Sequence, residues 1–233
     1  MVFAERGDVL RALTLPCGQC VGCRLERSRQ WAVRIMHEAS LHDVSSFVTL
    51  TYSDECLPSP PSLRYSDFQA FMRRLRKSHG KVRFFVCGEY GERTWRPHFH
   101  ACLFGLRFSD LKVYKKTAAG FTLYESSELS RVWTLGFASV GQLSFESAAY
   151  VARYCMKKVT GDLAETHYRK TDLNTGEMYD LVPEFARMSL KPGIGFQWFK
   201  QFRHEVGTHD GVVVRDRLCK PPRYYDKLLV DVS

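Results

Sequence analysis

The fold is decided by one stretch of sequence, Arg96-Pro97-His98-Phe99-His100-Ala101-Cys102-Leu103-Phe104. Successive side chains of a β-strand point to opposite faces, so His98 and His100 share one face while Phe99 lies on the other. Two imidazoles side by side, backed by an apolar face, form half of a metal site. The pattern therefore predicts a strand with one core face and one functional face.

A second apolar run, residues 82–87, precedes this strand and is followed by Glu89. The turn-rich residues 90–94 separate the two runs, so we expect an antiparallel hairpin in which Glu89 lies opposite His98. Two histidines and a carboxylate on one face suit a divalent metal ion with positions open for substrate. We expect Glu89, His98 and His100 to be exposed and to contribute little to stability. The alternative is a pair of ordinary strand histidines without a metal.

Length and composition predict one domain with a substantial core, because the 233 residues are 45% hydrophobic and 13% aromatic. The 34 basic residues exceed the 25 acidic ones and give a net charge of +9, which favours a polyanionic partner such as nucleic acid over an anionic membrane. No apolar run approaches the roughly 20 residues of a spanning helix, and the N-terminus lacks a signal-peptide core. We therefore expect a cytoplasmic protein with no membrane partner, whose cysteines are thiols or metal ligands.

Three cysteines, Cys17, Cys20 and Cys23, follow one another at the spacing of a metal knuckle. A fourth ligand is missing locally, and Cys56, Cys219 or a histidine would have to supply it. A structural Zn²⁺ and reduced structural thiols are both open interpretations, since a second Cys-x2-Cys motif is lacking. An iron–sulfur cluster is the third alternative.

The remaining elements follow from hydrophobic periodicity. Ser66 and Gln69 form a capping-box pattern that predicts the start of one helix. The tail over residues 220–225 is expected to be extended, and the chain from residue 170 onward to be irregular. Further helices are expected at residues 24–42, 127–133, 144–160 and 196–205, and strands at residues 46–52 and 136–143.

The helix predicted over residues 144–160 has an apolar arc and a distinct polar side. Tyr150 and Tyr154 are spaced i and i+4 and fall nearly opposite the arc, together with Lys157. Because other residues fill the core face, the two tyrosines should face water, a partner or a polar cleft. Arg153 and Lys158 flank them as candidate DNA contacts. The apolar arc consists of Phe145, Ala148, Ala149, Ala152, Cys155, Met156 and Val159.

Paired tyrosines beside cations suit nucleophilic attack on a phosphodiester. A phenol has a pKa near 10 and needs a neighbouring cation, here Lys157, to attack at neutral pH. This neighbour makes Tyr154 the expected nucleophile for the first cut, although helix tilt could reverse the order. A divalent ion at the histidines would polarise the scissile phosphate. The ligands suit Mn²⁺ or Mg²⁺ working with substrate oxygens, and also Zn²⁺.

Taken together, these motifs resemble those of the HUH endonucleases, the rolling-circle replication initiators and their relatives. The ordered set consists of residues 47–52, Glu89, His98-Phe99-His100 and Tyr150-x3-Tyr154. The flanking sequence resembles the replication initiators of the gokushovirus branch of the Microviridae. Those flanking stretches are residues 16–24, Arg29-Gln30-Trp31-Ala32, Pro192-Gly193-Ile194-Gly195 and Pro222-Arg223-Tyr224-Tyr225.

The resemblance implies an α+β fold with a central antiparallel sheet of about five strands, as in RRM and ferredoxin-like proteins, and with the tyrosines on a helix beside it. It implies nicking of a phage origin presented as single-stranded or hairpin DNA. One tyrosine would become linked to the 5′ phosphate and free a 3′ hydroxyl, and the second would complete strand transfer and religation. The sequence has no Gly-x4-Gly-Lys-Ser/Thr motif, so helicase and polymerase would come from the bacterial host, in its cytoplasm.

We expect residues 1–233 to form a single HUH endonuclease domain, with a Cys-rich N-terminal segment over residues 1–24 and an irregular appendage over residues 161–233. Two alternatives remain open. A zinc-dependent metallohydrolase would use the same three ligands to activate water, but it leaves the tyrosines unexplained. A non-catalytic basic DNA-binding protein explains the charge but gives the histidines and the glutamate no role.

Overall fold

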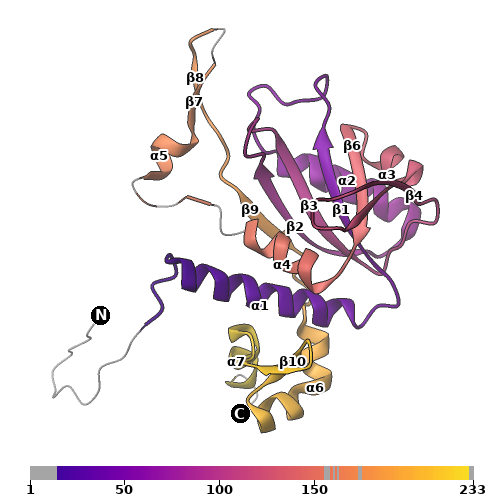
Figure 1. Ribbon diagram of the computed structural model, residues 1–233, viewed down its shortest axis with the longest axis vertical. Helices are drawn as coiled ribbons and strands as arrows, with labels where there is room; N and C mark the ends of the chain where they lie inside the picture. Colours follow the sequence, from indigo (N-terminus) through magenta and orange to yellow (C-terminus); the bar gives the residue numbers. More distant parts are fainter. Residues whose placement is uncertain (1–14, 155–157, 160, 162, 173–174, 231–233) are drawn as a thin grey trace, which may run out of the picture.

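A seven-stranded antiparallel sheet forms the centre of the computed structural model, which describes residues 15–154, 158–159, 161, 163–172 and 175–230 (Figure 1). The predicted α+β class is confirmed, and the sheet is larger than the expected five strands. Its strand order is β4-β5-β6-β1-β3-β2-β9. The strands are β1 Ser45–Tyr52, β2 Arg83–Tyr90, β3 Pro97–Phe104, β4 Lys112–Lys116, β5 Thr122–Glu125, β6 Gly136–Gln142 and β9 Phe185–Met188.

The central strand β3 holds the two histidines between two antiparallel neighbours. The β2–β3 hairpin pairs Glu89 directly with His98, which confirms the register predicted from the sequence. On the other side, β1 pairs Thr49 with His100. Because residues paired across a sheet point to the same face, these four side chains share one face.

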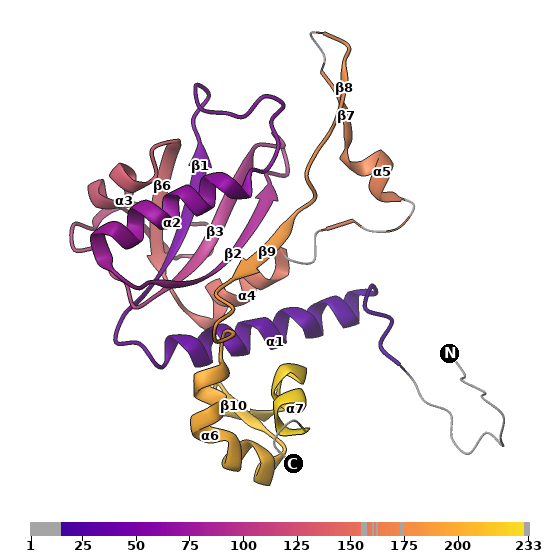
Figure 2. The same cartoon turned by 180° about the vertical axis from the view of Figure 1, so that it is seen from behind.

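The two faces of the sheet are covered by different helices. Helices α2 (Tyr65–His79) and α3 (Ser127–Val132) cover one face, and Phe99 packs there in a large aromatic cluster (Figure 2). Helices α1 (Val21–Ala39) and α4 (Phe145–Tyr154) cover the other face, which carries the histidines. Of the helices that the structure describes, none is long and apolar enough to span a membrane.

The C-terminal part is not irregular, contrary to the expectation from the sequence. Its elements are short, which hides their periodicity, and they are held by tertiary contacts: β9 extends the main sheet, and α6 and α7 pack on α1 below the sheet (Figure 1). The tail expected to be extended includes the start of α7, where Pro222 directly precedes the first turn and costs no helical hydrogen bond. The elements are α5 Leu163–Tyr168, β7 Arg169–Thr171, β8 Met178–Asp180, α6 Phe196–His209, β10 Val212–Val214, β11 Arg217–Cys219 and α7 Arg223–Val230.

Two helix starts differ from the prediction. Helix α1 begins at Val21, because the Cys20 side chain accepts a hydrogen bond from the backbone N–H of Cys23 and caps the helix early. Helix α2 begins at Tyr65 without a side-chain cap, so the capping box assigned to Ser66 is wrong. The ring of Tyr65 packs 5.6 Å from that of Phe185, and this tertiary contact outweighs the local capping signal.

Gly88 is needed for the site strand β2 to pack on the aromatic face. A Cβ atom at this position would lie 2.9 Å from Cζ of Phe185 and 3.0 Å from Cδ2 of Leu63. We expect Gly88→Ala to lower the free energy of unfolding by about 1–3 kcal/mol, as overpacking does. Gly91→Ala is the matched control, because the nearest atom there is 3.5 Å away. Equal urea midpoints for the two variants would contradict the expectation.

Candidate active site

Glu89, His98 and His100 bring their polar atoms together on the face covered by α1 and α4. Nε2 of His98 lies 2.6 Å from Oε1 of Glu89, and Nε2 of His100 lies 3.1 Å from the same oxygen. Each residue offers one ligand atom, and these three atoms lie within 4.8 Å of one another. The expected exposure is wrong for two of them, since the side chains of Glu89 and His100 are only 3% and 7% exposed under the covering helices.

The second ring nitrogen of each histidine is held by a neighbour. Nδ1 of His98 lies 3.1 Å from the carbonyl oxygen of Arg96. A carbonyl only accepts, so we assign the proton of that bond to Nδ1. Nδ1 of His100 lies 2.9 Å from the hydroxyl of Thr49. These partners orient both rings with Nε2 toward the carboxylate.

The donor set fits a cation at this point. With its proton on Nδ1, His98 would direct an Nε2 lone pair at a carboxylate oxygen, so a positive charge, from a second proton or a metal ion, must lie between them. Burial raises the pKa of Glu89, but hydrogen bonds to His100 and His98 and their charge lower it overall. The carboxylate is therefore ionised. Two imidazole nitrogens and one carboxylate oxygen are ligands suited to Mn²⁺, Mg²⁺ or Zn²⁺.

Helix α4 presents Tyr150 to this cluster. Ala148, Val151 and Ala152 are fully buried against the sheet and α1, whereas Tyr150 is 39% exposed, as its place opposite the apolar arc predicted. Its ring stands edge-on to His100, with the ring centroids 5.3 Å apart. The buried Val151 was not among the predicted core residues.

The other residues predicted from this helix are described only in part. The backbone of Tyr154 ends α4, but its side chain and all of Lys157 lie outside the described residues. The same holds for Cys155 and Met156 of the predicted core. Arg153 and Lys158 are exposed, as residues that contact DNA must be.

Thr49 and the carbonyl of Arg96 are site groups that the sequence analysis missed. Thr49 had a detectable signal, because it lies in the strand predicted over residues 46–52 and alternates with apolar neighbours. Its partnership with His100 depended on the β1–β3 register, which no local motif fixed. The Arg96 carbonyl had no sequence signal, since every residue carries one.

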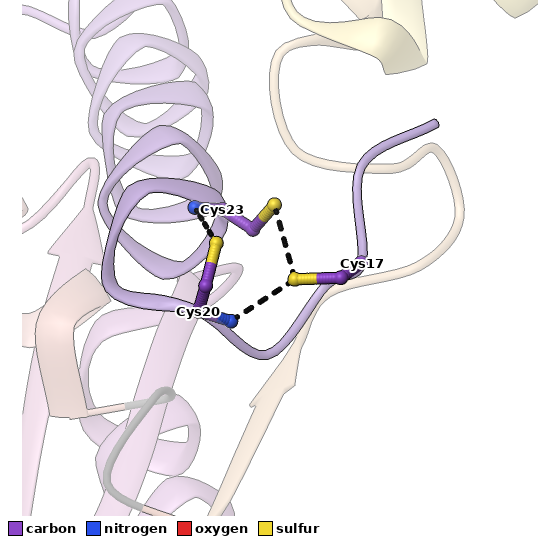
Figure 3. Close-up of side chains that lie close together, drawn as sticks. All are labelled: Cys17, Cys20 and Cys23. Carbon is purple, nitrogen blue, oxygen red and sulfur yellow. Dashed lines mark hydrogen bonds between the residues drawn. The ribbon is translucent and has the colours of Figure 1, made fainter. Parts of the chain in front are cut away.

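The three N-terminal cysteines form a second cluster at the start of α1. Figure 3 shows their side chains converging, with Sγ of Cys17 and Cys23 3.8 Å apart. The backbone N–H of Cys20 donates to Sγ of Cys17 at 3.2 Å. Hydrogen bonds from the backbone of Cys20 and Gln19 are the main cause that lowers the pKa of Cys17 to about 7. All three sulfur atoms lie within 4.8 Å of one another.

Comparisons with known proteins place the chain among replication-associated proteins of small phages. It is 34% identical to the replication-associated protein ORF2 of Spiroplasma virus 4, over 92% of this chain and 67% of the relative. It is 33% identical to the replication-associated protein VP4 of Bdellovibrio phage phiMH2K, over 93% of this chain and 67% of the relative. The replication-associated protein ORF4 of Chlamydia phage 1 is 32% identical, over 92% of this chain and 53% of the relative.

The family model described as replication-associated protein ORF2 matches residues 45–159. These residues span β1 to the segment after α4 and include the Glu89 cluster and Tyr150. The chain belongs to this family of replication-associated proteins. No solved structure matches it.

Proposed function

We propose that the protein is a metal-dependent, site-specific endonuclease and strand transferase that initiates rolling-circle replication by nicking single-stranded origin DNA. The observation that carries this proposal is the position of Tyr150, whose ring lies 5.3 Å from that of His100. A partly exposed phenol is thus next to two histidines and a carboxylate that fit a divalent cation. Membership in a phage replication-associated family supports the same function.

In the proposed reaction, the phenol oxygen of Tyr150 forms a bond to the phosphorus of the scissile phosphodiester, and the bond from phosphorus to the 3′ oxygen breaks. The phenol loses its proton to solvent, and the 3′ oxygen takes up a proton. The products are a 5′-phosphotyrosine link and a free 3′ hydroxyl. Glu89, His98 and His100 would hold one Mn²⁺ or Mg²⁺ ion, which supplies positive charge beside the phosphate and the attacking phenol.

Tyr154 is proposed as the second nucleophile. It lies one helical turn after Tyr150, and residues spaced i and i+4 share one helix face. A second phenol could attack the regenerated origin, and the 3′ hydroxyl released there could attack the first phosphotyrosine and religate the strand. Lys157 is proposed to favour the phenolate of Tyr154. The position of Tyr150 beside His100 favours Tyr150 for the first cut, so this order is the reverse of the one expected from Lys157.

The proposed substrate and partners follow from charge and family. A net charge of +9 and the exposed Arg153 and Lys158 favour binding of single-stranded or hairpin origin DNA. A host helicase and a host DNA polymerase are the proposed further partners, in the bacterial cytoplasm. Single-stranded origin-region DNA labelled at its 3′ end, incubated with the protein and Mn²⁺, tests the proposal directly. A labelled protein–DNA adduct that resists denaturation supports it, and cleavage without an adduct would leave only a hydrolase.

We further propose that Cys17, Cys20 and Cys23 bind a structural Zn²⁺ ion. Four ligands at about 2.3 Å in a tetrahedron lie about 3.8 Å apart, and Sγ of Cys17 and Cys23 are separated by 3.8 Å. A disulfide would need about 2.05 Å. The ion would fix the first turn of α1, which packs along α4.

Purified protein is expected to contain about one tightly bound zinc ion per chain, released by a thiol-reactive mercurial. Cys17→Ser should reduce the zinc content at least fivefold, because three ligands become two. Cys56→Ser, outside the cluster, should retain the metal and is the control. Wild-type protein free of zinc by elemental analysis would remove this proposal and leave the catalytic one untouched.

A further inference from the structure

A pocket of about 300 Å³ lies between α1 and α7, outside the Glu89 cluster. In both views α7 lies beside α1, on the side away from the main sheet (Figures 1 and 2). Two arginines, two aromatic residues and one amide line it. They are Arg27, Gln30, Trp31, Arg34 and Tyr224.

Arg34 is the centre of the pocket. Its guanidinium carbon lies 4.0 Å from the ring centroid of Trp31 and 3.8 Å from that of Tyr224, so two rings sandwich it. Nε donates to the carbonyl of Ile194 at 3.0 Å, which leaves the two terminal nitrogens for another acceptor. In the parts of the chain that the structure describes, no carboxylate oxygen pairs with this group. Burial lowers the pKa of Arg34 to about 10, so it is still charged at neutral pH.

Three stretches that carry the sequence resemblance meet here, and none of them belongs to the Glu89 cluster. Residues 29–32 provide Trp31, and residues 222–225 provide Tyr224. Residues 192–195 provide the carbonyl of Ile194. Gly193 in this stretch leaves room for the Tyr224 hydroxyl, which a Cβ atom would meet at 2.7 Å. The chain therefore builds this arrangement from three distant segments.

Packing alone explains some of these groups but not all. Gln30 accepts a hydrogen bond from the backbone N–H of Arg223 and so ties α7 to α1. Arg27, in contrast, is exposed at the edge of the pocket and makes no hydrogen bond or ion pair within the described residues. A contact that only joined two helices would not need a second cation beside Arg34. Two guanidinium groups at one pocket are suited to a phosphate.

We propose that this pocket binds a phosphodiester group of the single-stranded DNA, with Arg27 and Arg34 as its ligands. The proposal rests on the proposed nicking function, for which it supplies a second anchor of the strand. Trp31 packs 4.9 Å from Phe85, which lies on the same face of β2 as Glu89 and four residues before it. At about 3.3 Å per residue the separation along β2 is about 13 Å, which a few nucleotides span.

The test is the affinity of the full chain for a fluorescein-labelled single-stranded oligonucleotide, measured by anisotropy over a range of NaCl concentrations without Mn²⁺ or Mg²⁺. Arg27→Gln should weaken binding about 5- to 20-fold and reduce the salt slope by about one. Arg73→Gln, an exposed arginine on α2 across the sheet, is the matched control and should bind like wild type. Arg34→Lys keeps the charge but loses the planar fork, so it should weaken binding with little change in slope.

Folding of each variant is checked by its melting temperature, and Arg27 is exposed, so its variant remains informative if Arg34→Lys fails to fold. Equal affinities for Arg27→Gln and Arg73→Gln would overturn the proposal. Displacement of the oligonucleotide by inorganic phosphate at constant ionic strength identifies the source. If millimolar phosphate fills the pocket in ³¹P spectra while Arg27→Gln leaves DNA affinity unchanged, the pocket binds a free anion and the proposal fails. If Arg27→Gln weakens DNA binding but wild type forms no adduct, the nicking function fails and the pocket stands.

Discussion

Replacing both Tyr150 and Tyr154 by Phe is expected to abolish the covalent protein–DNA adduct, with a loss of at least about 1000-fold. Phenylalanine keeps each ring and its packing but removes the only oxygen that could bond to phosphorus. The contact between Tyr150 and His100 is made by rings, so the variant should keep its fold and metal site. Adduct formation with labelled single-stranded origin DNA and Mn²⁺ is the measurement.

The single variants separate the roles of the two tyrosines. Tyr150→Phe should lose the first adduct, because Tyr150 lies beside His100, and Tyr154→Phe should form an adduct but fail to complete strand transfer. The control is Tyr114→Phe, a 53% exposed tyrosine on β4 that should retain full activity. The opposite result for the two single variants would reverse their order. An adduct in the double variant would mean that another residue is the nucleophile.

The site strands could be predicted because their signals are local. A hairpin between residues 82–87 and the strand of His98 has few possible registers, and the one that buries the apolar alternation pairs Glu89 with His98. The face of Tyr150 was predictable for the same reason, since helical periodicity alone separates it from Ala148 and Ala152.

The parts that were missed depend on distant contacts. Strand β4 is exposed along its whole length, so it shows no alternation that would reveal it. The start of α2 is fixed by packing of Tyr65, and the C-terminal helices α6 and α7 by packing on Val33 of α1. The partnership of Thr49 with His100 required the order of strands in the sheet, which follows from the whole chain.

Glu89→Gln is expected to abolish metal-dependent nicking while keeping the shape of the site. Glutamine fills the same volume but carries no charge, so the remaining ligands are two neutral imidazoles. Loss of the carboxylate should weaken Mn²⁺ binding by at least 10- to 100-fold, which is the range for removing a supporting metal contact. Manganese binding is followed by electron paramagnetic resonance of the free ion, and nicking by the adduct assay.

The two histidine substitutions report on stability as well as on metal, because the carboxylate between them is buried. His98→Ala with His100→Ala would leave the 3% exposed side chain of Glu89 without either ring. A buried charge that loses its partners costs about 3–5 kcal/mol, so this variant should melt well below wild type. Adding Glu89→Gln to the same variant removes the charge and should recover much of that stability, but no metal binding and no nicking. Full nicking in the double histidine variant would show that these residues do not form the catalytic metal site. Recovery of stability without recovery of activity would separate the electrostatic role of the three residues in the fold from their role in catalysis.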